Sequence, residues 1–376
     1  MADRISNLPD EFLCYILCFM STKQAVATCV LSKRWKLLWR SVPTLDFDDT
    51  GRFSYNKDMY SGFVRFVYAI MLSRVSHSLQ PIQNFHLKCC SSYCDPSDVN
   101  AWVNAALQRR VEHISLFTPR QVVPSAIFSH RPLVVLKLTG LTVKALSSVD
   151  FPALKVLYLR QVTFLKLGFL VELLSGCPVL EDLVAMGLCF KNSLIEGEFK
   201  RLPKLVRIYT CKPLFEKLRA TVNDVEFLHI YGMDAVNNFK EMNMFHKLTH
   251  VELTYYKHTR DWREVVEFLK HCPKLQILVI NKVLLGGYKE EEGDVLYPQS
   301  VPESISSHLK TCCFNNYHGL TAEFRFARYI MQYARILRTM KICVDSTTAN
   351  LQAKHEMLKN LSLCSRLSTT CKLSFK

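Results

Sequence analysis

Clustered cysteines are the first side chains in this sequence whose type and spacing could support chemistry. Cys89, Cys90 and Cys94 form the only group of three neighbouring cysteines, and no two of the fifteen cysteines have CxxC spacing. Structural zinc sites take their ligands from cysteines and histidines at short fixed spacings, which this group lacks. We therefore interpret the cysteines as reduced, small hydrophobic residues of a reducing compartment, and we predict no metal site.

A group of three acidic residues could bind a cation. Asp46, Asp48 and Asp49 follow a predicted helix within four positions of one another. Calcium and magnesium sites add further fixed oxygen ligands to such carboxylates, and none is apparent nearby. A solvated turn is therefore the favoured interpretation of this group.

His271 next to Cys272 is the only adjacent pair that resembles a nucleophile with its base. The same helix-end sequence recurs with Gly176 before Cys177, which favours packing over catalysis. The chain also lacks the GxxxxGK[ST] phosphate loop, the GxGxxG turn, the GxSxG elbow and the HExxH helix. We predict a protein without catalytic residues and without a cofactor.

Composition and length describe a folded chain built from more than one unit. The chain has 376 residues, 49% of them hydrophobic, with only 12 glycines and 14 prolines. This predicts two or three compact units or one extended repeat array. The first residues lack the features of a secretory signal, and the apolar stretches 59–72 and 162–174 are too short to cross a bilayer. We expect an intracellular protein of the nucleus, the cytoplasm or both.

The net charge of +15, from 48 basic and 33 acidic residues, suits an anionic partner. The basic residues are spread thinly, without a block of five or more. This distribution favours an acidic protein partner over a defined nucleic-acid groove. A basic repeat protein that binds nucleic acid or an anionic surface remains the alternative hypothesis.

Residues 5–47 have the pattern of three short helices. Pro9 is suited to a helix start, and apolar residues then recur with helical spacing at Phe12, Leu13, Ile16, Leu17 and Met20. Ser21 and Gln24 form a capping-box pair for the second helix. Ser32 can cap the third helix, whose apolar face carries Trp35, Leu38 and Trp39. Three helices in about 40 residues cannot bury all of this surface, so either the rest of the chain or another protein must cover it.

This N-terminal segment, "RISNLPDEFLCYILCFMSTKQAVATCVLSKRWKLLWRSVPTLDFDD", resembles a plant-type F-box nearly end to end. The shared elements are Leu8-Pro9, Ile16-Leu17, Thr22-Lys23, the run from Val30 to Trp35, and Leu38-Trp39. One departure is Ser21, where the family often has proline. Proteins with an F-box recruit a cullin-type ubiquitin ligase to a target that they bind. A third hypothesis is that this chain still binds a target but no longer recruits a cullin, and this departure is the only hint of it.

The F-box resemblance implies a partner and a set of contact residues. In the family, the F-box binds a Skp-family adaptor, which binds a cullin carrying a RING subunit. The adaptor-binding residues carried over to this chain are Leu8, Pro9, Ile16, Leu17, Val30 and Trp35. An aromatic anchor with aliphatic neighbours forms a hot spot, in which each anchor contributes about 2 kcal/mol or more. The alternative for any one of these residues is packing within the F-box itself.

A second pattern, apolar residues at i, i+3 and i+5, recurs along the middle of the chain. The clearest copies are Leu133/Leu136/Leu138, Leu154/Leu157/Leu159, Val225/Leu228/Ile230, Leu248/Val251/Leu253 and Leu275/Leu278/Ile280, with weaker copies from Ile82, Val111, Leu180 and Leu205. From Leu133 onward the starts lie about 20 to 27 residues apart, the period of leucine-rich repeats. Each repeat supplies one strand, and stacking buries the apolar face that one repeat cannot bury alone.

The repeat leucines are interpreted as core, so recognition falls to the alternate strand positions i+2 and i+4, on the concave face. We predict that a target protein is bound by residues at these positions: Lys137, Tyr158, Asp182, Arg207, His229, His250 and Glu252.

The last eighty residues follow an acidic, glycine-containing segment at 286–294 that indicates a loop or boundary. We predict a helix with Phe326 and Ile330 on its apolar face, a strand through 337–342, a helix over 347–361 and a last strand near 371–375. The region resembles the FBD domain of plant F-box proteins. The matching residues are Val301-Pro302, Ser306 to Lys310, Ala327 to Ile330, Leu337 to Met340 and Ser368 to Phe375, with Phe314 at a tryptophan-type position.

The sequence therefore predicts an α/β protein: an N-terminal three-helix F-box, a leucine-rich-repeat solenoid and a C-terminal FBD-like α/β cap. The expected boundaries are 1–47, 48–285, an acidic loop at 286–298, and 299–376. The expected function is that of a non-catalytic substrate-recognition adaptor in an SCF-type (Skp–cullin–F-box) ubiquitin ligase, with no membrane partner. The sequence does not identify the target.

Overall fold

A computed structural model describes residues 5, 7–50, 56–74, 81–146, 148–192, 198–233, 242–256, 262–283, 301–344 and 351–376. The chain forms two compact units, Met1–Leu202 and Pro203–Lys376. Each unit is a mixed α/β structure and is described by itself.

Unit 1 begins with short helices whose ends follow local capping. These are α1 (Asp10–Leu17), α2 (Thr22–Ala27) and α3 (Trp35–Leu38), with 3-10 turns at Thr28–Val30 and Trp39–Ser41. The Ser21 hydroxyl accepts a hydrogen bond from the Gln24 N–H, and the Gln24 side chain accepts one from the Ser21 N–H, so the predicted capping box is confirmed. The predicted cap at Ser32 is wrong, because α3 begins only after Arg34 and has no side-chain cap.

The main sheet of unit 1 is parallel throughout. Its strands, in spatial order, are β1 (Thr44–Asp48), β2 (Asn84–Lys88), β3 (His113–Phe117), β4 (Val135–Thr139), β6 (Val156–Arg160) and β8 (Asp182–Met186). The i+3 and i+5 residues of each repeat are buried on one face, including those of the weaker copies from Ile82 and Val111. A smaller parallel sheet holds β5 (Thr142–Val143), β7 (Thr163–Lys166) and β9 (Cys189–Asn192).

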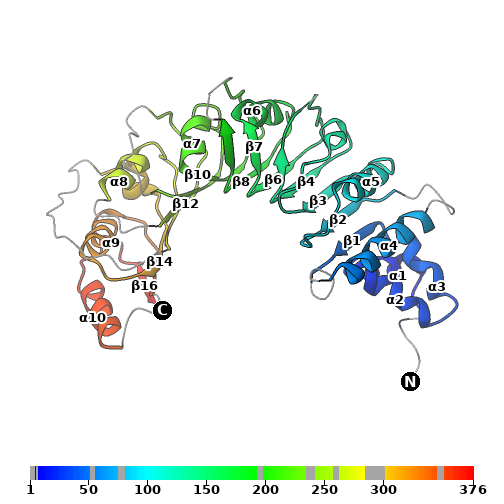
Figure 1. The fold of residues 1–376 in the computed structure, drawn as a ribbon. Helices are drawn as coiled ribbons and strands as arrows, with labels where there is room; N and C mark the ends of the chain where they lie inside the picture. Colours follow the sequence, from blue (N-terminus) through cyan, green and yellow to red (C-terminus); the bar gives the residue numbers. More distant parts are fainter. Residues whose placement is uncertain are drawn as a thin grey trace. The chain divides into compact units, whose positions relative to one another are not determined.

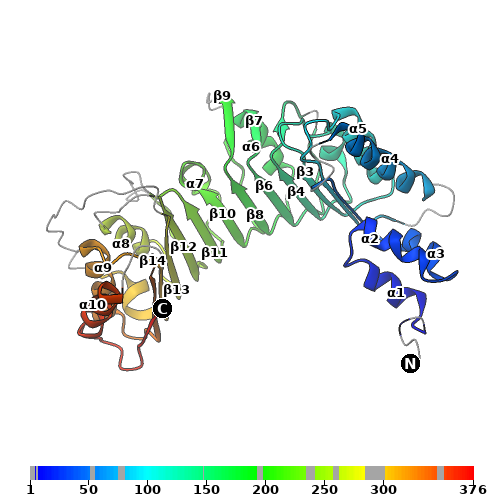
Figure 2. The same ribbon diagram turned by 60° about the horizontal axis from the view of Figure 1, so that its bottom comes forward.

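The segments that connect the strands of unit 1 cover the buried face of its main sheet. They include α4 (Lys57–Ser73), α5 (Pro96–Leu107), a 3-10 turn (Ser125–Ser129) and α6 (Leu167–Ser175). Figure 1 shows α4, α5 and α6 on the same side of the strands. Trp102 of α5 packs edge-on against Phe63 and Tyr68 of α4, which joins the first two of these segments. The opposite face of the sheet carries no helix of this unit among β2 to β8, as Figure 2 also shows for the described residues.

Unit 2 continues the same construction from Pro203. Its parallel strands are β10 (Arg207–Cys211), β11 (Phe227–Tyr231), β12 (His250–Tyr255), β13 (Ile277–Lys282), β14 (Thr311–Tyr317), β15 (Thr339–Val344) and β16 (Lys372–Phe375). Its helices are α7 (Lys212–Leu218), α8 (Arg263–Lys270), a π turn (Ser304–His308), α9 (Thr321–Tyr333) and α10 (Leu351–Ser362).

Most elements predicted for the C-terminal region are present. The helix through Phe326, the strand at 337–342 and the last strand appear as α9, β15 and β16. The helix predicted from 347 is described from Leu351, and the acidic segment at 286–298 lies outside the described residues. The strand β14 was not predicted, although Leu309, Cys312 and Phe314 keep the repeat spacing and are all buried.

An aromatic and ionic core holds α9 against β13 and β14. The Trp262 ring stacks on Phe326 at a centroid distance of 5.1 Å, and Phe314 packs against both rings. The ammonium of Lys282 lies 5.8 Å from the Trp262 centroid and pairs with the carboxylate of Glu323. The same carboxylate accepts hydrogen bonds from the N–H groups of His318 and Leu320. A buried charge pair is tolerated only with such additional partners.

Candidate functional site

The N-terminal helices leave one side of their apolar surface exposed. On α1, Leu13 and Leu17 point into the core, whereas Phe12, Tyr15 and Ile16 are exposed. The apolar residues predicted at helical spacing are therefore divided between a buried and an exposed side, because so few residues cannot bury all of their apolar surface. Further exposed apolar side chains follow at Val30, Leu31 and Leu37. We call the exposed set the N-terminal apolar surface: Phe12, Tyr15, Ile16, Val30, Leu31 and Leu37.

The six residues that the F-box resemblance assigned to adaptor binding fall into two groups. Ile16 and Val30 are exposed, at 42% and 83%, Pro9 is exposed and Leu8 is half-buried. Leu17 and Trp35 are buried within this chain. The partner-facing role expected for these two is therefore corrected to packing that holds the helices together. Sequence reasoning also missed Phe12, Tyr15, Leu31 and Leu37, although the i, i+3, i+4 spacing of Phe12, Tyr15 and Ile16 is a usable signal.

Polar contacts fix the N-terminal helices to each other and to the first repeat. Arg34 donates to the Asp10 carboxylate and to the Leu8 carbonyl, which joins the starts of α1 and α3. The Thr22 hydroxyl accepts the Asp46 N–H at 2.7 Å, so α2 caps the free edge of β1. The Trp39 carbonyl accepts from the buried guanidinium of Arg74 at the end of α4. Burial lowers the pKa of Arg74 to about 10.

The open face of unit 1 carries three of the predicted target-binding residues. Lys137 on β4 is exposed and lies opposite the half-buried Tyr158 of β6 in the strand register. Asp182 on β8 is half-buried and lies opposite Val156, one level along the sheet. Lys137 and Tyr158 are therefore register neighbours on adjacent strands, and Asp182 lies on the following strand, opposite a different residue of β6.

The open face of unit 2 brings three of the predicted residues into contact. The Glu252 carboxylate lies 3.3 Å from Nδ1 of His229 and 3.3 Å from Nε2 of His250. Nε2 of His229 is 2.9 Å from the Thr254 hydroxyl. The fourth residue, Arg207, is exposed and lies opposite Phe227 in the strand register. His229 is itself buried, so the structure does not present it for the predicted contact with a target, and its imidazole contacts Glu252 instead.

Aromatic rings that the sequence analysis did not single out frame this contact. His229 stacks on Tyr231 at 4.0 Å and packs against Tyr209 at 5.8 Å, and His250 meets the Phe227 ring edge-on at 4.7 Å. These aromatic residues could have been identified from the sequence, because they occupy the same alternate strand positions as the predicted target-binding residues. We call this set the histidine–aromatic face: Tyr209, Phe227, His229, Tyr231, His250 and Glu252.

Electrostatics keep this face neutral at His229 and anionic at Glu252. Burial lowers the pKa of His229, so its imidazole stays uncharged at neutral pH. The hydrogen bond from His250 lowers the pKa of Glu252. Among the residues that the structure describes, no group of three His, Cys, Asp or Glu side chains, this one included, could hold a metal ion.

Cys177 and Cys272, which lie at the same position of two similar helix-end sequences, form the same kind of contact in their two repeats. The Sγ of Cys177 donates to the Leu173 carbonyl at 3.1 Å, and the Sγ of Cys272 donates to the Phe268 carbonyl at 3.6 Å. Burial raises the pKa of Cys177 to about 12 and also raises that of Cys272, so neither thiol is poised as a nucleophile. All fifteen cysteines are free.

The three clustered aspartates do not form the solvated turn that was favoured. Asp49 is fully buried and accepts hydrogen bonds from the N–H groups of Cys90 and Ser91. Asp48 pairs with Lys88 at 3.2 Å, and Asp46 is half-buried on the open face of β1. The strand β1 runs through Asp48 and fixes where each of these side chains lies, which is why the three separate.

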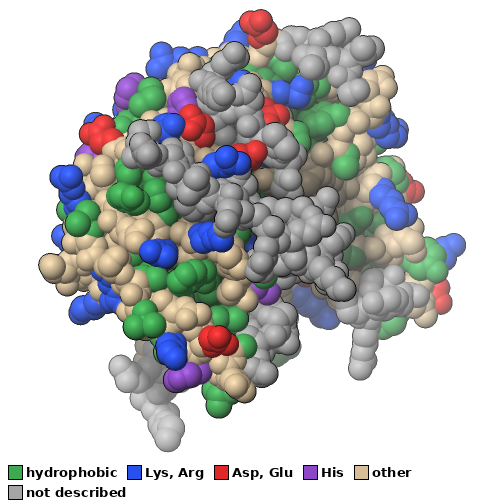
Figure 3. All heavy atoms as spheres, turned by 90° about the vertical axis from the view of Figure 1, so that its left-hand side faces the viewer, with side chains coloured by type: hydrophobic (Ala, Val, Ile, Leu, Met, Phe, Trp, Pro, Cys, Tyr) green, Lys and Arg blue, Asp and Glu red, His purple; other side chains and the backbone are tan. Residues whose placement is uncertain are grey.

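The basic residues do not gather into a single stripe on the face of the molecule that Figure 3 displays. Its described Lys and Arg side chains stand singly among acidic, hydrophobic and neutral ones. A nucleic-acid groove needs several phosphate-binding side chains in register. The described residues on this face therefore form no such groove.

Comparisons with known families match the three parts of the chain. An F-box domain model matches residues 5–47, and an FBD model matches residues 297–342. A third model, described as FBD-associated F-box protein At5g56370, LRR repeats, matches residues 99–219. The chain is 31% identical to FBD-associated F-box protein At4g10400 of Arabidopsis thaliana, over 99% of this chain and 100% of the relative. The chain belongs to the FBD-associated F-box protein family.

Two further relatives from Arabidopsis thaliana match over similar lengths. Probable FBD-associated F-box protein At1g32375 and F-box/FBD/LRR-repeat protein At4g26340 are each 28% identical, over 99% of this chain and 100% of each relative. The resemblance to a plant F-box, leucine-rich-repeat and FBD family is therefore confirmed. No helix among the described residues is long and apolar enough to span a membrane.

Proposed function

We propose that this FBD-associated F-box protein is a non-catalytic substrate-recognition subunit of an SCF-type ubiquitin ligase. Its F-box binds a Skp-family adaptor and, through it, a cullin and a RING subunit. Its repeats bind a target protein and hold it near the ubiquitin-loaded partner, so that proximity accelerates transfer. The expected location is intracellular, in the nucleus, the cytoplasm or both.

The observation that carries the proposal is the N-terminal apolar surface. Val30 is 83% exposed and Ile16 is 42% exposed on helices that bury Leu17 and Trp35 beneath them. An apolar patch of this kind on a small helical segment marks a protein-interaction site. Its position within residues matched by an F-box model supports a Skp-family adaptor as the partner.

The remaining parts follow from the same scheme. A three-helix F-box at 1–47, repeats at 48–285, a boundary loop at 286–298 and an FBD-like domain at 299–376 are the proposed divisions. The residues proposed to face the target are Lys137, Tyr158 and Asp182 in unit 1 and Arg207, His250 and Glu252 in unit 2. The strands β14 to β16 and the helices α9 and α10 are proposed to cap the repeats, because β16 pairs only with β15 among the described strands.

A pull-down with a purified plant Skp-family adaptor tests the adaptor contact. The double variant Ile16→Ala, Val30→Ala is expected to lower adaptor affinity by about 2 kcal/mol or more, roughly thirtyfold, because truncated hot-spot anchors leave their pockets unfilled. Its free energy of unfolding should stay within about 0.5 kcal/mol of the wild type, since both side chains are exposed.

The matched control is the double variant Leu351→Ala, Leu363→Ala, which truncates two exposed leucines at α10. It is expected to bind the adaptor like the wild type. An adaptor that fails to bind the folded wild-type protein, or that binds all three proteins equally, contradicts the proposed adaptor contact.

A further inference from the structure

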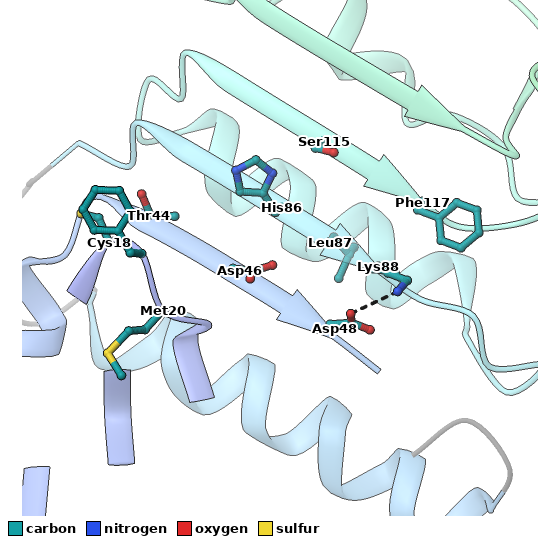
Figure 4. Close-up of a pocket in the computed structure, with 11 residues that line it drawn as sticks. Cys18, Met20, Thr44, Asp46, Asp48, His86, Leu87, Lys88, Ser115 and Phe117 are labelled. Carbon is teal, nitrogen blue, oxygen red and sulfur yellow. Dashed lines mark hydrogen bonds and ion pairs between the residues drawn. The ribbon is translucent and has the colours of Figure 1, made fainter. Parts of the chain in front are cut away.

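A cavity of about 440 Å³ lies between the end of α1 and the open face of β1, β2 and β3. One wall is formed by Cys18, Phe19 and Met20, which follow α1. The floor is formed by side chains of the three strands, and Figure 4 shows Asp46, His86 and Ser115 side by side across it. Every lining residue belongs to unit 1, so the cavity is complete within that unit.

The charges in this cavity do not cancel. Asp48 and Lys88 neutralise each other across a 3.2 Å ion pair, drawn in Figure 4. The carboxylate of Asp46 forms no hydrogen bond or ion pair with the residues that the structure describes, although its N–H is held by Thr22. His86 lies opposite Asp46 in the strand register. Asp46 therefore supplies one unneutralised negative charge in a chain whose net charge is +15.

Burial acts on both titratable groups in the direction that favours a cationic occupant. Desolvation raises the pKa of Asp46, and the nearby His86 and Lys88 act in the opposite direction without forming an ion pair with it. Desolvation also lowers the pKa of His86, so the imidazole stays uncharged at neutral pH and does not supply an ion-pair partner. A guanidinium or ammonium entering the cavity would provide the missing charge and the missing hydrogen bonds.

The wall suits the rest of such a side chain. Phe19 is 76% exposed, and its ring packs edge-on against Tyr15 at 5.1 Å. Met20 and Phe117 extend the apolar lining. Lysine and arginine have long aliphatic stems that pack on apolar surface, and both cations interact favourably with aromatic faces.

We propose that this cavity binds an arginine or lysine side chain of the target protein, with Asp46 as the ion-pair partner and Phe19 and Met20 against the aliphatic stem. The choice of a target protein as the source of the cation rests on the proposed function, whereas the preference of the cavity for a cation does not. The site lies at the β1 end of the open face, beside the N-terminal helices.

Fluorescence polarisation of the full-length protein with labelled pentapeptides tests the proposal. The probes are Ala-Ala-X-Ala-Ala-amide, with arginine, lysine, citrulline or glutamate as X. Arginine and lysine are expected to bind about tenfold more tightly than citrulline, which has the shape of arginine without its charge. Asp46→Asn should remove this preference, and high salt should weaken it.

Asp150→Asn is the matched control, because it also removes one carboxylate from unit 1 but at an exposed ion pair with Arg131. It should leave peptide binding unchanged. Equal binding of arginine and citrulline peptides, tighter binding of glutamate, an unaltered preference in Asp46→Asn, or no binding of any peptide at millimolar concentration overturns the proposal. Adaptor binding, measured on the same variants, reports on the proposed function separately, since Asp46 is not part of the N-terminal apolar surface.

Discussion

The N-terminal helices and the repeats of unit 2 differ in how far they bury the same kinds of side chain. In the first region Phe12 and Val30 are exposed, whereas in the second the repeat leucines Leu228 and Leu278 are completely buried. The difference extends to charge, since Asp10 and Arg34 pair at the surface and Lys282 and Glu323 pair in the core. A stack of repeats completes its own core, whereas the N-terminal helices leave apolar side chains exposed.

The ion pairs offer the largest test of this comparison. Glu323→Gln leaves the Lys282 ammonium buried without its counter-charge, and removal of one partner of a buried pair costs about 3 to 5 kcal/mol. Asp10→Asn breaks the surface pair, whose loss costs at most about 1 kcal/mol. Urea unfolding of both variants measures the two values. Equal losses would contradict the inference that unit 2 holds its charges in a closed core.

Leucine truncation tests the apolar side of the same comparison. Leu278→Ala in β13 should lower the free energy of unfolding by about 2 to 5 kcal/mol, because it leaves a cavity in a packed core. Leu37→Ala on α3 removes an exposed side chain and should change stability by no more than about 0.5 kcal/mol. Thermal unfolding with both variants, together with adaptor binding, separates stability from docking. A large loss of stability in Leu37→Ala would mean that this surface belongs to the fold.

The sequence was most informative where one rule governed every repeat. Leu136, Leu138 and their equivalents were identified as core from the i, i+3, i+5 spacing alone, since each strand buries one face. The same rule fits Leu309, Cys312 and Phe314, but a pattern with cysteine in place of leucine was not recognised as a strand. The resemblance to an F-box and an FBD domain supplied the family.

The candidate binding sites could not be predicted in the same way, because they depend on side-chain packing that the spacing of residues in the sequence does not determine. Trp35 and Val30 both belong to the F-box pattern, yet one is buried and the other is exposed, because the N-terminal helices are too short for the pattern to distinguish their two sides. The contact of Glu252 with both His229 and His250 requires the parallel register of β11 and β12. The cavity at Asp46 needs the end of α1 to lie over β1, which neither segment encodes by itself.

Acid should act on the histidine–aromatic face and spare the N-terminal helices, and this is the smallest expected effect. The folded-state pKa of His229 is lowered, so the unfolded chain takes up a proton near its ordinary pKa of about 6.5 while the folded chain does not. Its contribution is therefore present above that pH and is lost progressively below it. The lowered pKa of Glu252 acts in the same direction at lower pH.

Residues 5–47 contain no histidine, so they lack this response. Hydrogen exchange, corrected for its intrinsic pH dependence, should show lower protection of β11 and β12 at pH 5.5 than at pH 7.5, with α1 and α2 unchanged. The variant His229→Gln keeps a hydrogen-bonding side chain that does not titrate, and it should remove most of the difference. A difference that persists in this variant would assign the acid response to another group, because the substituted amide has no proton to gain when the chain unfolds.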